Sequence, residues 1–203
     1  MKQPLNPLFG RQQKNIVLYR RALPGCSRWL EIRPLHPARD IRLLHQWVNQ
    51  PYAKPYWQME GPIGRLYRHY ENFLDSGQGY SLMFFLDGRQ VALTDYYRVA
   101  ADELKAHYDY RENDYGIHLL MGPVETPVHG LTQAVMITAL AYLFSLSIGR
   151  VAGEPDIRNE KANRLVRQTG FRFLKTIDMS YKTANLYLYD RCEFIARHGG
   201  VMM

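Results

Sequence analysis

YGIHLLMG, at residues 115–122, is the stretch around which the rest of this chain can be arranged. Its residues alternate, so that Ile117 and Leu119 lie on one face of a predicted β-strand while His118 and Leu120 lie on the other. His118 therefore points away from one apolar layer. The stretch is predicted to be a central strand that carries a titratable side chain.

A turn rich in proline and glycine, at residues 123–130, separates this strand from a helix predicted over residues 132–147. The first turn of that helix offers unpaired backbone N–H groups and a positive dipole end, which together favour an anion. A second strand is predicted at residues 150–154. The loop at residues 155–158 then leads into an amphipathic helix that ends at Gly170.

The rest of the chain supplies further elements in a mixed order. Strands are predicted at residues 29–33, 81–86, 90–97, 176–181 and 185–189, and helices from residue 40 and at residues 63–74. The turn Asp87-Gly88-Arg89 marks the clearest hairpin. About seven strands and four helices are expected, which favours an α+β fold with a mixed central sheet.

One domain is expected, because 203 residues are enough for one full core. We assign residues 29–194 to this domain, residues 1–28 to an N-terminal extension without sustained periodicity, and residues 195–203 to a flexible tail. The apolar segment at residues 135–148 contains polar side chains and is shorter than the roughly 18 residues of a membrane span. No membrane segment is therefore predicted.

Charge and cysteine content narrow the classes of partner. The net charge of +7 comes from scattered Lys and Arg residues without a basic run, so nucleic-acid binding is not predicted, and a phosphate-rich cofactor accounts for the excess. Cys26 and Cys192 are far apart and form no metal-binding spacing, which favours free thiols and no metal. A secretory signal is lacking, so a cytoplasmic protein is expected.

The central stretch resembles the core of the GCN5-related N-acyltransferases, in which a strand turns through a pyrophosphate-binding loop into a helix and a later helix ends in Gly-Phe, here Gly170-Phe171. Three motifs are similar to those of siderophore-biosynthesis acyltransferases that acylate N-hydroxylated amines. They are GIHLL at residues 116–120, EPDIRN at residues 154–159 and WQMEG at residues 57–61. The resemblance covers roughly residues 30–194.

This resemblance implies roles for individual residues. The family has a histidine on this strand and an aspartate in the Glu-Pro-Asp loop, and His118 and Asp156 occupy those positions, so both are predicted to be catalytic. Cofactor binding is predicted for Leu120, Met121, Gly130, Leu131, Thr132, Asn159 and Lys161, and substrate binding for Trp57, Met59, Glu60, Asp95 and Glu154.

The chain also departs from the superfamily pattern. In its pyrophosphate loop only Gly130 matches, and Glu125 is expected to turn its side chain away from phosphate. Val166 stands where many members have a tyrosine that protonates the leaving thiolate.

Plainer roles remain open for several of these residues. His118 could be a half-buried histidine bonded to a carbonyl, and Trp57 could simply cover the edge of the core. Asp156 could cap the following helix, a position for which Asn159 competes.

The resemblance implies an acyl-CoA-dependent N-acyltransferase that forms a hydroxamate from an N-hydroxylated diamine or N-hydroxylysine for a siderophore. Acetyl-CoA or succinyl-CoA would be the co-substrate, with other enzymes of siderophore biosynthesis as partners. Asp95, with Glu60 as second choice, is expected to pair with a distal ammonium of the acceptor.

Two alternatives remain. An aminoglycoside or other amine N-acetyltransferase would be expected to line its acceptor cleft with more carboxylates than Glu60, Asp95 and Glu154. A non-catalytic acyl-CoA-binding module would tolerate the loss of His118.

Overall fold

The computed structural model describes residues 16–23, 25, 27–124 and 126–199, and the statements below refer to these residues. The strands are β1 (Tyr19–Ala22), β2 (Trp29–Pro34), β3 (Gly79–Leu86), β4 (Arg89–Arg98), β5 (Asp114–Met121), β6 (Arg150–Gly153), β7 (Arg172–Asp178) and β8 (Thr183–Asp190). The helices are α1 (Pro37–Val48), α2 (Lys54–Trp57), α3 (Ile63–Asp75), α4 (Leu131–Ser145), α5 (Glu160–Thr169) and α6 (Arg191–His198), with 3-10 turns η2 (Val99–Ala101) and η3 (Glu103–Ala106).

The strand order is β1-β2-β3-β4-β5-β6-β8-β7. β5 and β6 are parallel, whereas β1–β2, β2–β3, β6–β8 and β7–β8 pair antiparallel. The predicted α+β class and mixed sheet are therefore confirmed, with eight strands and six α-helices in the described residues instead of about seven and four.

Contacts divide the chain into two compact units. The first, here the N-terminal unit, comprises residues up to Asp95 together with residues 119–127, and the second, the C-terminal unit, comprises residues 96–118 and 128 onward. β4 and β5 contribute residues to both units. Each unit is described by itself.

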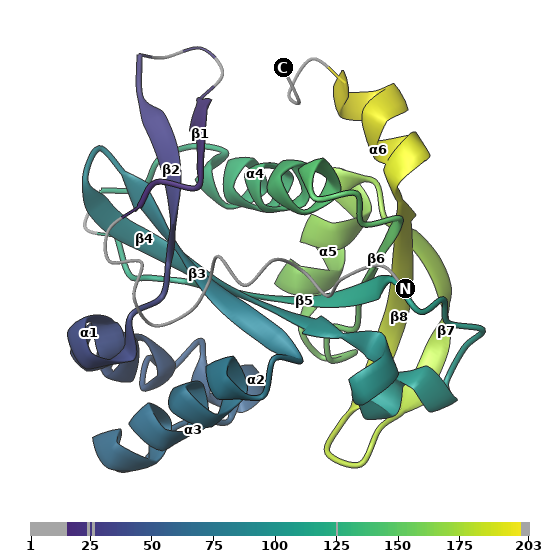
Figure 1. Ribbon diagram of the computed structural model, residues 1–203, viewed down its shortest axis with the longest axis horizontal. Helices are drawn as coiled ribbons and strands as arrows, with labels where there is room; N and C mark the ends of the chain where they lie inside the picture. The colour runs from purple at the N-terminus through teal and green to yellow at the C-terminus, as the bar shows by residue number, and fades with distance from the viewer. Residues whose placement is uncertain (1–15, 24, 26, 125, 200–203) are drawn as a thin grey trace. The chain divides into compact units, whose positions relative to one another are not determined.

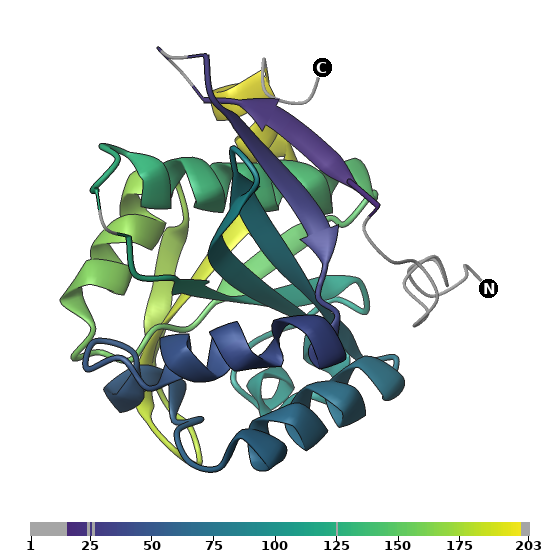
Figure 2. The ribbon, with the colours of Figure 1, turned by 90° about the vertical axis from the view of Figure 1, so that its left-hand side faces the viewer.

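In the N-terminal unit, α1 and α3 lie side by side (Figure 2). Their apolar faces meet residues of β3 and β4 in one cluster, in which Leu44, Val48 and Tyr70 are fully buried. Gly122 belongs to this unit, and a Cβ atom there would lie 2.5 Å from the indole ring of Trp47. The short residue is therefore required at the end of β5, because a side chain would displace the ring.

In the C-terminal unit, α4 and α5 are neighbours (Figure 1). α4 is apolar on almost every side and is buried along most of its length, as expected of a core helix. α5 is amphipathic and ends at Gly170, whose φ of +123° suits only glycine. The helix predicted at residues 132–147 is confirmed to within two residues, and the predicted end of the later helix at Gly170 is confirmed.

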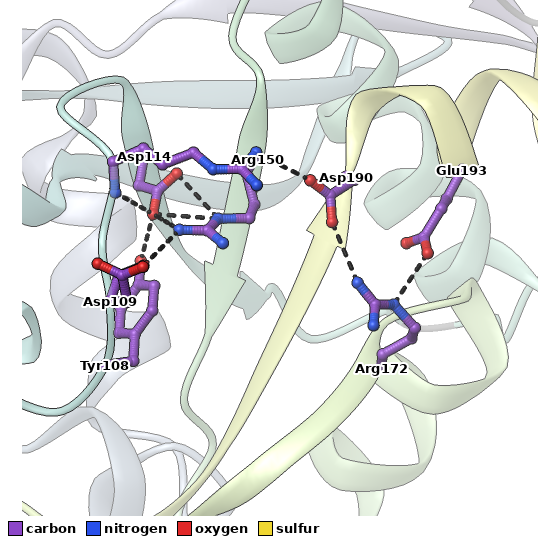
Figure 3. A network of polar contacts seen from close by, with 8 residues as sticks. Tyr108, Asp109, Asp114, Arg150, Arg172, Asp190 and Glu193 are labelled. Carbon is purple, nitrogen blue, oxygen red and sulfur yellow. Dashed lines mark hydrogen bonds and ion pairs between the residues drawn. The ribbon is translucent and has the colours of Figure 1, made fainter.

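A buried ion pair joins β5 to β6 (Figure 3). The Nη2 atom of Arg150 donates to Oδ2 of Asp114 at 2.6 Å, and the Asp114 side chain is 1% exposed. Asp114 also accepts from the Tyr108 hydroxyl at 2.8 Å and from the Arg111 N–H at 3.0 Å. The carboxylate therefore fixes the segment before β5 as well as the first residue pair of the two strands.

Four elements differ from the prediction. β1 lies in the stretch assigned to an extension, and α2 lies in the aromatic loop. β7 begins at Arg172, before the predicted start at residue 176, because residues 172–176 are exposed on both faces and show no alternation from which a strand could be predicted. α6 continues through His198, in the stretch predicted to be loose, because Phe194 is fully buried against the rings of Phe144 and Tyr189.

Two further predictions concern individual residues or segments. Within the described residues, no helix combines the length and the apolar character that a membrane crossing needs. Cys192 is exposed and carries a free thiol. Cys26 and Glu125 lie outside the described residues.

Candidate active site

The centre of the candidate site lies where two parallel strands part. The pairing of β5 with β6 ends at Gly116 and Ala152. His118 and Glu154 lie two residues beyond this last pair, so the period of two along a strand aims both side chains to the same side. The two side chains therefore meet, although 36 residues separate them along the chain.

His118 is held by a buried carboxylate. Its Nε2 atom lies 2.5 Å from Oε1 of Glu154. The Glu154 side chain is fully buried, whereas 39% of the His118 side chain is exposed. With the proton on Nε2 donated to Glu154, the basic lone pair of the imidazole is on Nδ1. The arrangement orients a histidine that solvent can reach.

Glu154 also interacts with a lysine. Nζ of Lys182 donates to the backbone carbonyl of Glu154 at 2.6 Å and lies 3.6 Å from its Oε1 atom. Burial acts to raise the pKa of Glu154, but the charges of His118 and Lys182 outweigh it and lower the pKa to about 2. Glu154 is therefore ionised at neutral pH.

Tyr97 packs against His118, with ring centroids 5.0 Å apart. A Cβ atom at Gly116 would lie 1.9 Å from Cζ of Tyr97, so only glycine leaves room for this ring. Burial, with the charge of Glu154, raises the pKa of the Tyr97 hydroxyl well above its ordinary value. Tyr97 is therefore a neutral phenol next to the His118–Glu154 pair.

Asp156 makes its hydrogen bonds locally. Oδ1 accepts from the Arg158 backbone N–H at 2.8 Å, and Oδ2 accepts from the Arg158 guanidinium at 2.7 Å. These hydrogen bonds from Arg158 lower the pKa of Asp156. The cap of α5 is Asn159, whose Oδ1 accepts from Ala162 N–H at 3.1 Å. Of the two residues that competed for this position, Asn159 occupies it.

Asn163 holds this loop against β8. Its side-chain N–H groups donate to the backbone carbonyl of Asp156 at 2.8 Å, and its Oδ1 accepts from Asn185 at 2.9 Å and from the Tyr187 hydroxyl at 3.0 Å. Asn163 is itself buried. The loop that carries Glu154 and Asp156 is therefore fixed from both sides.

The first turn of α4 offers a second feature of the C-terminal unit. Gly130 precedes the helix with φ of +73°, and no side chain caps the helix N-terminus. A Cβ atom at Gly130 would meet nothing within 4 Å. The N–H groups from Leu131 and Thr132 onward start a 15-residue helix, so this end can bind an anion. Lys161 is exposed on the first turn of α5, the helix next to α4.

Asp95 belongs to the N-terminal unit, where it is buried. Its Oδ1 accepts from the Ser81 hydroxyl at 2.5 Å, and its Oδ2 accepts from the Tyr70 hydroxyl at 3.4 Å. Two hydroxyl donors therefore hold the carboxylate in place.

The other predicted residues of this unit lie on or near one apolar cluster. Trp57 and Met59 are half-buried against it, and Leu120 is one of its buried members. The Tyr52 hydroxyl donates a hydrogen bond to the backbone carbonyl of Met121 at 2.9 Å. Glu60 is exposed. The structure thus brings Trp57, Met59 and Leu120 to one cluster, and brings His118 and Glu154 together in the other unit.

Sequence reasoning missed Lys182 and Tyr97. Lys182 lies in a turn, and nothing local marks it. Gly116 in the middle of a predicted strand was a usable signal for Tyr97, because a glycine there often marks a close approach. In the part of the chain that the structure describes, no group of His, Cys, Asp and Glu side chains is arranged to hold a metal.

Curated relatives resemble most of the chain. An N(6)-hydroxylysine O-acetyltransferase of Escherichia coli is 27% identical over 184 residues, which are 90% of this chain and 58% of that protein. An N-hydroxyputrescine acetyltransferase of Acinetobacter baumannii is 27% identical over 186 residues, which are 88% of this chain and 89% of that protein. The chain therefore spans little more than half the length of the first of these relatives.

A solved structure shares the fold of this chain, and a family model matches most of its sequence. An aminoglycoside acetyltransferase in complex with coenzyme A matches with a TM-score of 0.72 at 16% identity, covering 84% of this chain and 99% of that one, which shows a shared fold. The family model described as an acetyltransferase (GNAT) domain matches residues 36–179, about seven tenths of the sequence. The protein therefore belongs to the GNAT acetyltransferase family.

Proposed function

We propose that the protein is an acyl-CoA-dependent N-acyltransferase that converts an N-hydroxylated diamine or N-hydroxylysine into a hydroxamate during siderophore assembly. The observation that carries the proposal is the accessible imidazole of His118, held by the buried carboxylate of Glu154. The names of the relatives from Escherichia coli and Acinetobacter baumannii support the acceptor class. Other siderophore-pathway enzymes and the cytoplasm are the proposed partners and location.

His118 is proposed as the general base. Hydroxylation lowers the basicity of an amine nitrogen, so this nucleophile is mostly neutral near pH 7. As the nitrogen attacks the thioester carbonyl, the new C–N bond forms, the C–S bond breaks, and coenzyme A leaves as the thiolate. Nδ1 of His118 takes the proton of the nitrogen, and the charge of Glu154 stabilises the imidazolium that results.

Asp156 retains a proposed place in catalysis by ordering the loop beside this pair. Its carboxylate accepts a hydrogen bond from the Arg158 guanidinium, and its backbone carbonyl accepts one from the Asn163 side chain. These two bonds together fix the backbone that follows Glu154. An orienting role of this kind fits a carboxylate that is already hydrogen-bonded.

Coenzyme A is proposed to place its pyrophosphate at the first turn of α4. The backbone of Gly130, Leu131 and Thr132 would donate to the phosphates, with Asn159 and Lys161 on α5 as further contacts. In β5, Leu120 and Met121 are proposed to accompany the acyl end, since the strand continues there from His118.

Substituting aspartate at Gly130 is expected to abolish the increase in melting temperature that coenzyme A produces, whereas Gly130→Asn should retain most of it. Both side chains tolerate a positive φ comparatively well, and they differ mainly in charge. The measurement is thermal unfolding with and without coenzyme A. An equal increase in both variants would place the pyrophosphate elsewhere.

The acceptor is proposed to be bound by the loop that carries Trp57, Met59 and Glu60, with Asp95 as the partner of a distal ammonium. Asp95 is buried, so an ammonium that reached it would lose its hydration and would need this charge.

Replacing Asp95 with asparagine is expected to raise KM for a hydroxylated diamine by about tenfold or more, and to raise it less for a monoamine hydroxylamine without the distal charge. Ser81→Ala is the matched control, because it removes a hydroxyl partner of Asp95 and keeps the carboxylate. Glu60→Gln tests the second choice. Equal increases for both acceptors in Asp95→Asn would remove Asp95 from acceptor recognition.

The direct test of the function is release of free thiol from coenzyme A thioesters. Acetyl-CoA, succinyl-CoA and a longer acyl-CoA are each combined with hydroxyputrescine, hydroxycadaverine and hydroxylysine, and with an aminoglycoside as the competing acceptor. Thiol release with a hydroxylated amine supports the proposal. Release only with the aminoglycoside, or binding of acyl-CoA without release, would support one of the two alternatives.

A further inference from the structure

Lys182 occupies an unusual place for a lysine in a turn. The turn between β7 and β8 is closed by a hydrogen bond from Met179 N–H to the Lys182 carbonyl at 2.8 Å. Lysines in such turns are ordinarily solvated. Here 11% of the side chain is exposed, and its ammonium points inward to the residue that follows β6. Burying this ammonium costs free energy, so its contacts are expected to matter.

The ammonium contacts Glu154 in two ways. It donates to the backbone carbonyl of Glu154 at 2.6 Å, which fixes the main chain, and it lies 3.6 Å from Oε1. The same Oε1 atom is 2.5 Å from Nε2 of His118. One carboxylate oxygen is therefore shared between the imidazole of His118 and the side-chain nitrogen of Lys182.

The other charged and titratable groups around the pair are largely acidic or neutral. Asp102 lies between η2 and η3, Glu103 begins η3, Tyr97 comes from β4, and Tyr181 from the turn that carries Lys182. Asp156 also interacts with Lys182, and its own charge is paired with Arg158. Asp102 interacts electrostatically with both Glu154 and His118. Carboxylates near an imidazole favour its protonated form, which cannot act as a base. Lys182 supplies an opposing positive charge next to Glu154.

We infer that Lys182 is a positioning residue that keeps His118 unprotonated and oriented, by neutralising part of the charge of Glu154. The inference rests on the proposed role of His118 as the base, and it adds what sets the protonation of that base. Without the lysine charge, Glu154 and Asp102 together hold the proton on His118 to higher pH. The fraction of enzyme with a usable base at neutral pH then falls.

Three variants separate charge from anchoring. Lys182→Met removes both the charge and the hydrogen bond to the Glu154 carbonyl. Lys182→Gln removes the charge and keeps an N–H donor, and it is the second variant if the methionine form does not fold. Lys182→Arg keeps the charge. Lys175→Met is the matched control, since Lys175 is exposed on β7 and its loss changes the net charge equally.

The test is an NMR titration of the His118 side chain. Its resonance is identified as the one that disappears from the spectrum of a His118 variant. The pKa of His118 is expected to rise by roughly one unit in Lys182→Gln and Lys182→Met, and to stay at the wild-type value in Lys182→Arg and Lys175→Met. An unchanged pKa in Lys182→Gln would overturn the inference and leave Lys182 as a backbone anchor.

A second readout separates this inference from the proposed function. The acidic limb of the kcat/KM profile for thiol release is expected to move to higher pH by the same amount as the NMR titration. If the titration moves and the activity profile does not, Lys182 still controls the protonation of His118, and it is the proposed base role that fails. If neither moves in Lys182→Gln, the inference fails while the proposed function stands.

Discussion

Replacing His118 with alanine is expected to lower kcat for hydroxamate formation by about 10²-fold or more, and to leave the binding of coenzyme A unchanged. The imidazole is the accessible half of the His118–Glu154 pair, so its loss removes the proposed proton acceptor without touching the first turn of α4. Steady-state thiol release measures kcat, and the melting temperature with and without coenzyme A measures binding.

Two further variants control this result. His107→Ala removes a half-exposed histidine from the end of η3 and should leave kcat near the wild-type value. Glu154→Gln keeps the size of the side chain but removes its charge, so it should lower kcat while leaving His118 present. If His118→Ala turned over at the wild-type rate, the neutral hydroxylamine would react without a base and the assignment would be wrong.

Loss of the Asp114 carboxylate is expected to lower the free energy of unfolding by about 3–5 kcal/mol in Asp114→Ala. Arg150 would remain buried without its partner, and the donors of Tyr108 and Arg111 would lose their acceptor. Chemical denaturation with circular dichroism measures the change. The effect is large because one carboxylate accepts from three different residues.

Arg172→Ala is the matched control, because it breaks ion pairs that Figure 3 shows in the same unit. Arg172 lies 3.2 Å from Asp190 and 2.9 Å from Glu193, but its side chain is 63% exposed. Exposed pairs are worth about 0–1 kcal/mol. If the two single variants were destabilised equally, burial would not determine the contribution of the Asp114–Arg150 pair.

Local chemistry made part of the fold predictable. The hairpin at Asp87 and Gly88 was predicted from its turn residues, and both adopt positive φ, 49° and 80°. The end of α5 was predicted from Gly170 for the same kind of reason. At both places the backbone must adopt a positive φ, and the residue that allows it stands at that position in the sequence. A short stretch of sequence is therefore enough to predict the turn or the helix end.

The partner of His118 illustrates what a sequence does not disclose. Glu154 and Asp156 stand two residues apart in one loop, and the resemblance favoured Asp156 as the catalytic carboxylate. The hydrogen bond to His118 goes to Glu154, because β5 and β6 pair in a register that aligns Gly116 with Ala152. A register between strands 36 residues apart depends on the whole sheet, and a loop motif does not contain it.

Lys182 was unpredictable for a similar reason. Its inward course depends on β8 pairing with β6, which brings the turn before β8 to the residue after β6. The sequence of the β7–β8 turn does not reveal that it contacts the loop after β6, and the sequence of that loop does not reveal the turn. Edge strand β7 was predicted too late in the sequence because consecutive exposed apolar residues, Phe173 and Leu174, carry no alternation.

The contact between Gly116 and Tyr97 constrains how this site can vary during evolution. Because any side chain at position 116 would occupy the space of the Tyr97 ring, position 116 cannot change while a large ring remains at position 97. A chain that acquires alanine at 116 must first lose the large ring at 97, and with it the neutral phenol against His118. The constraint therefore runs one way: homologues with a side chain at position 116 should also have a smaller residue at position 97, whereas glycine at 116 is compatible with either.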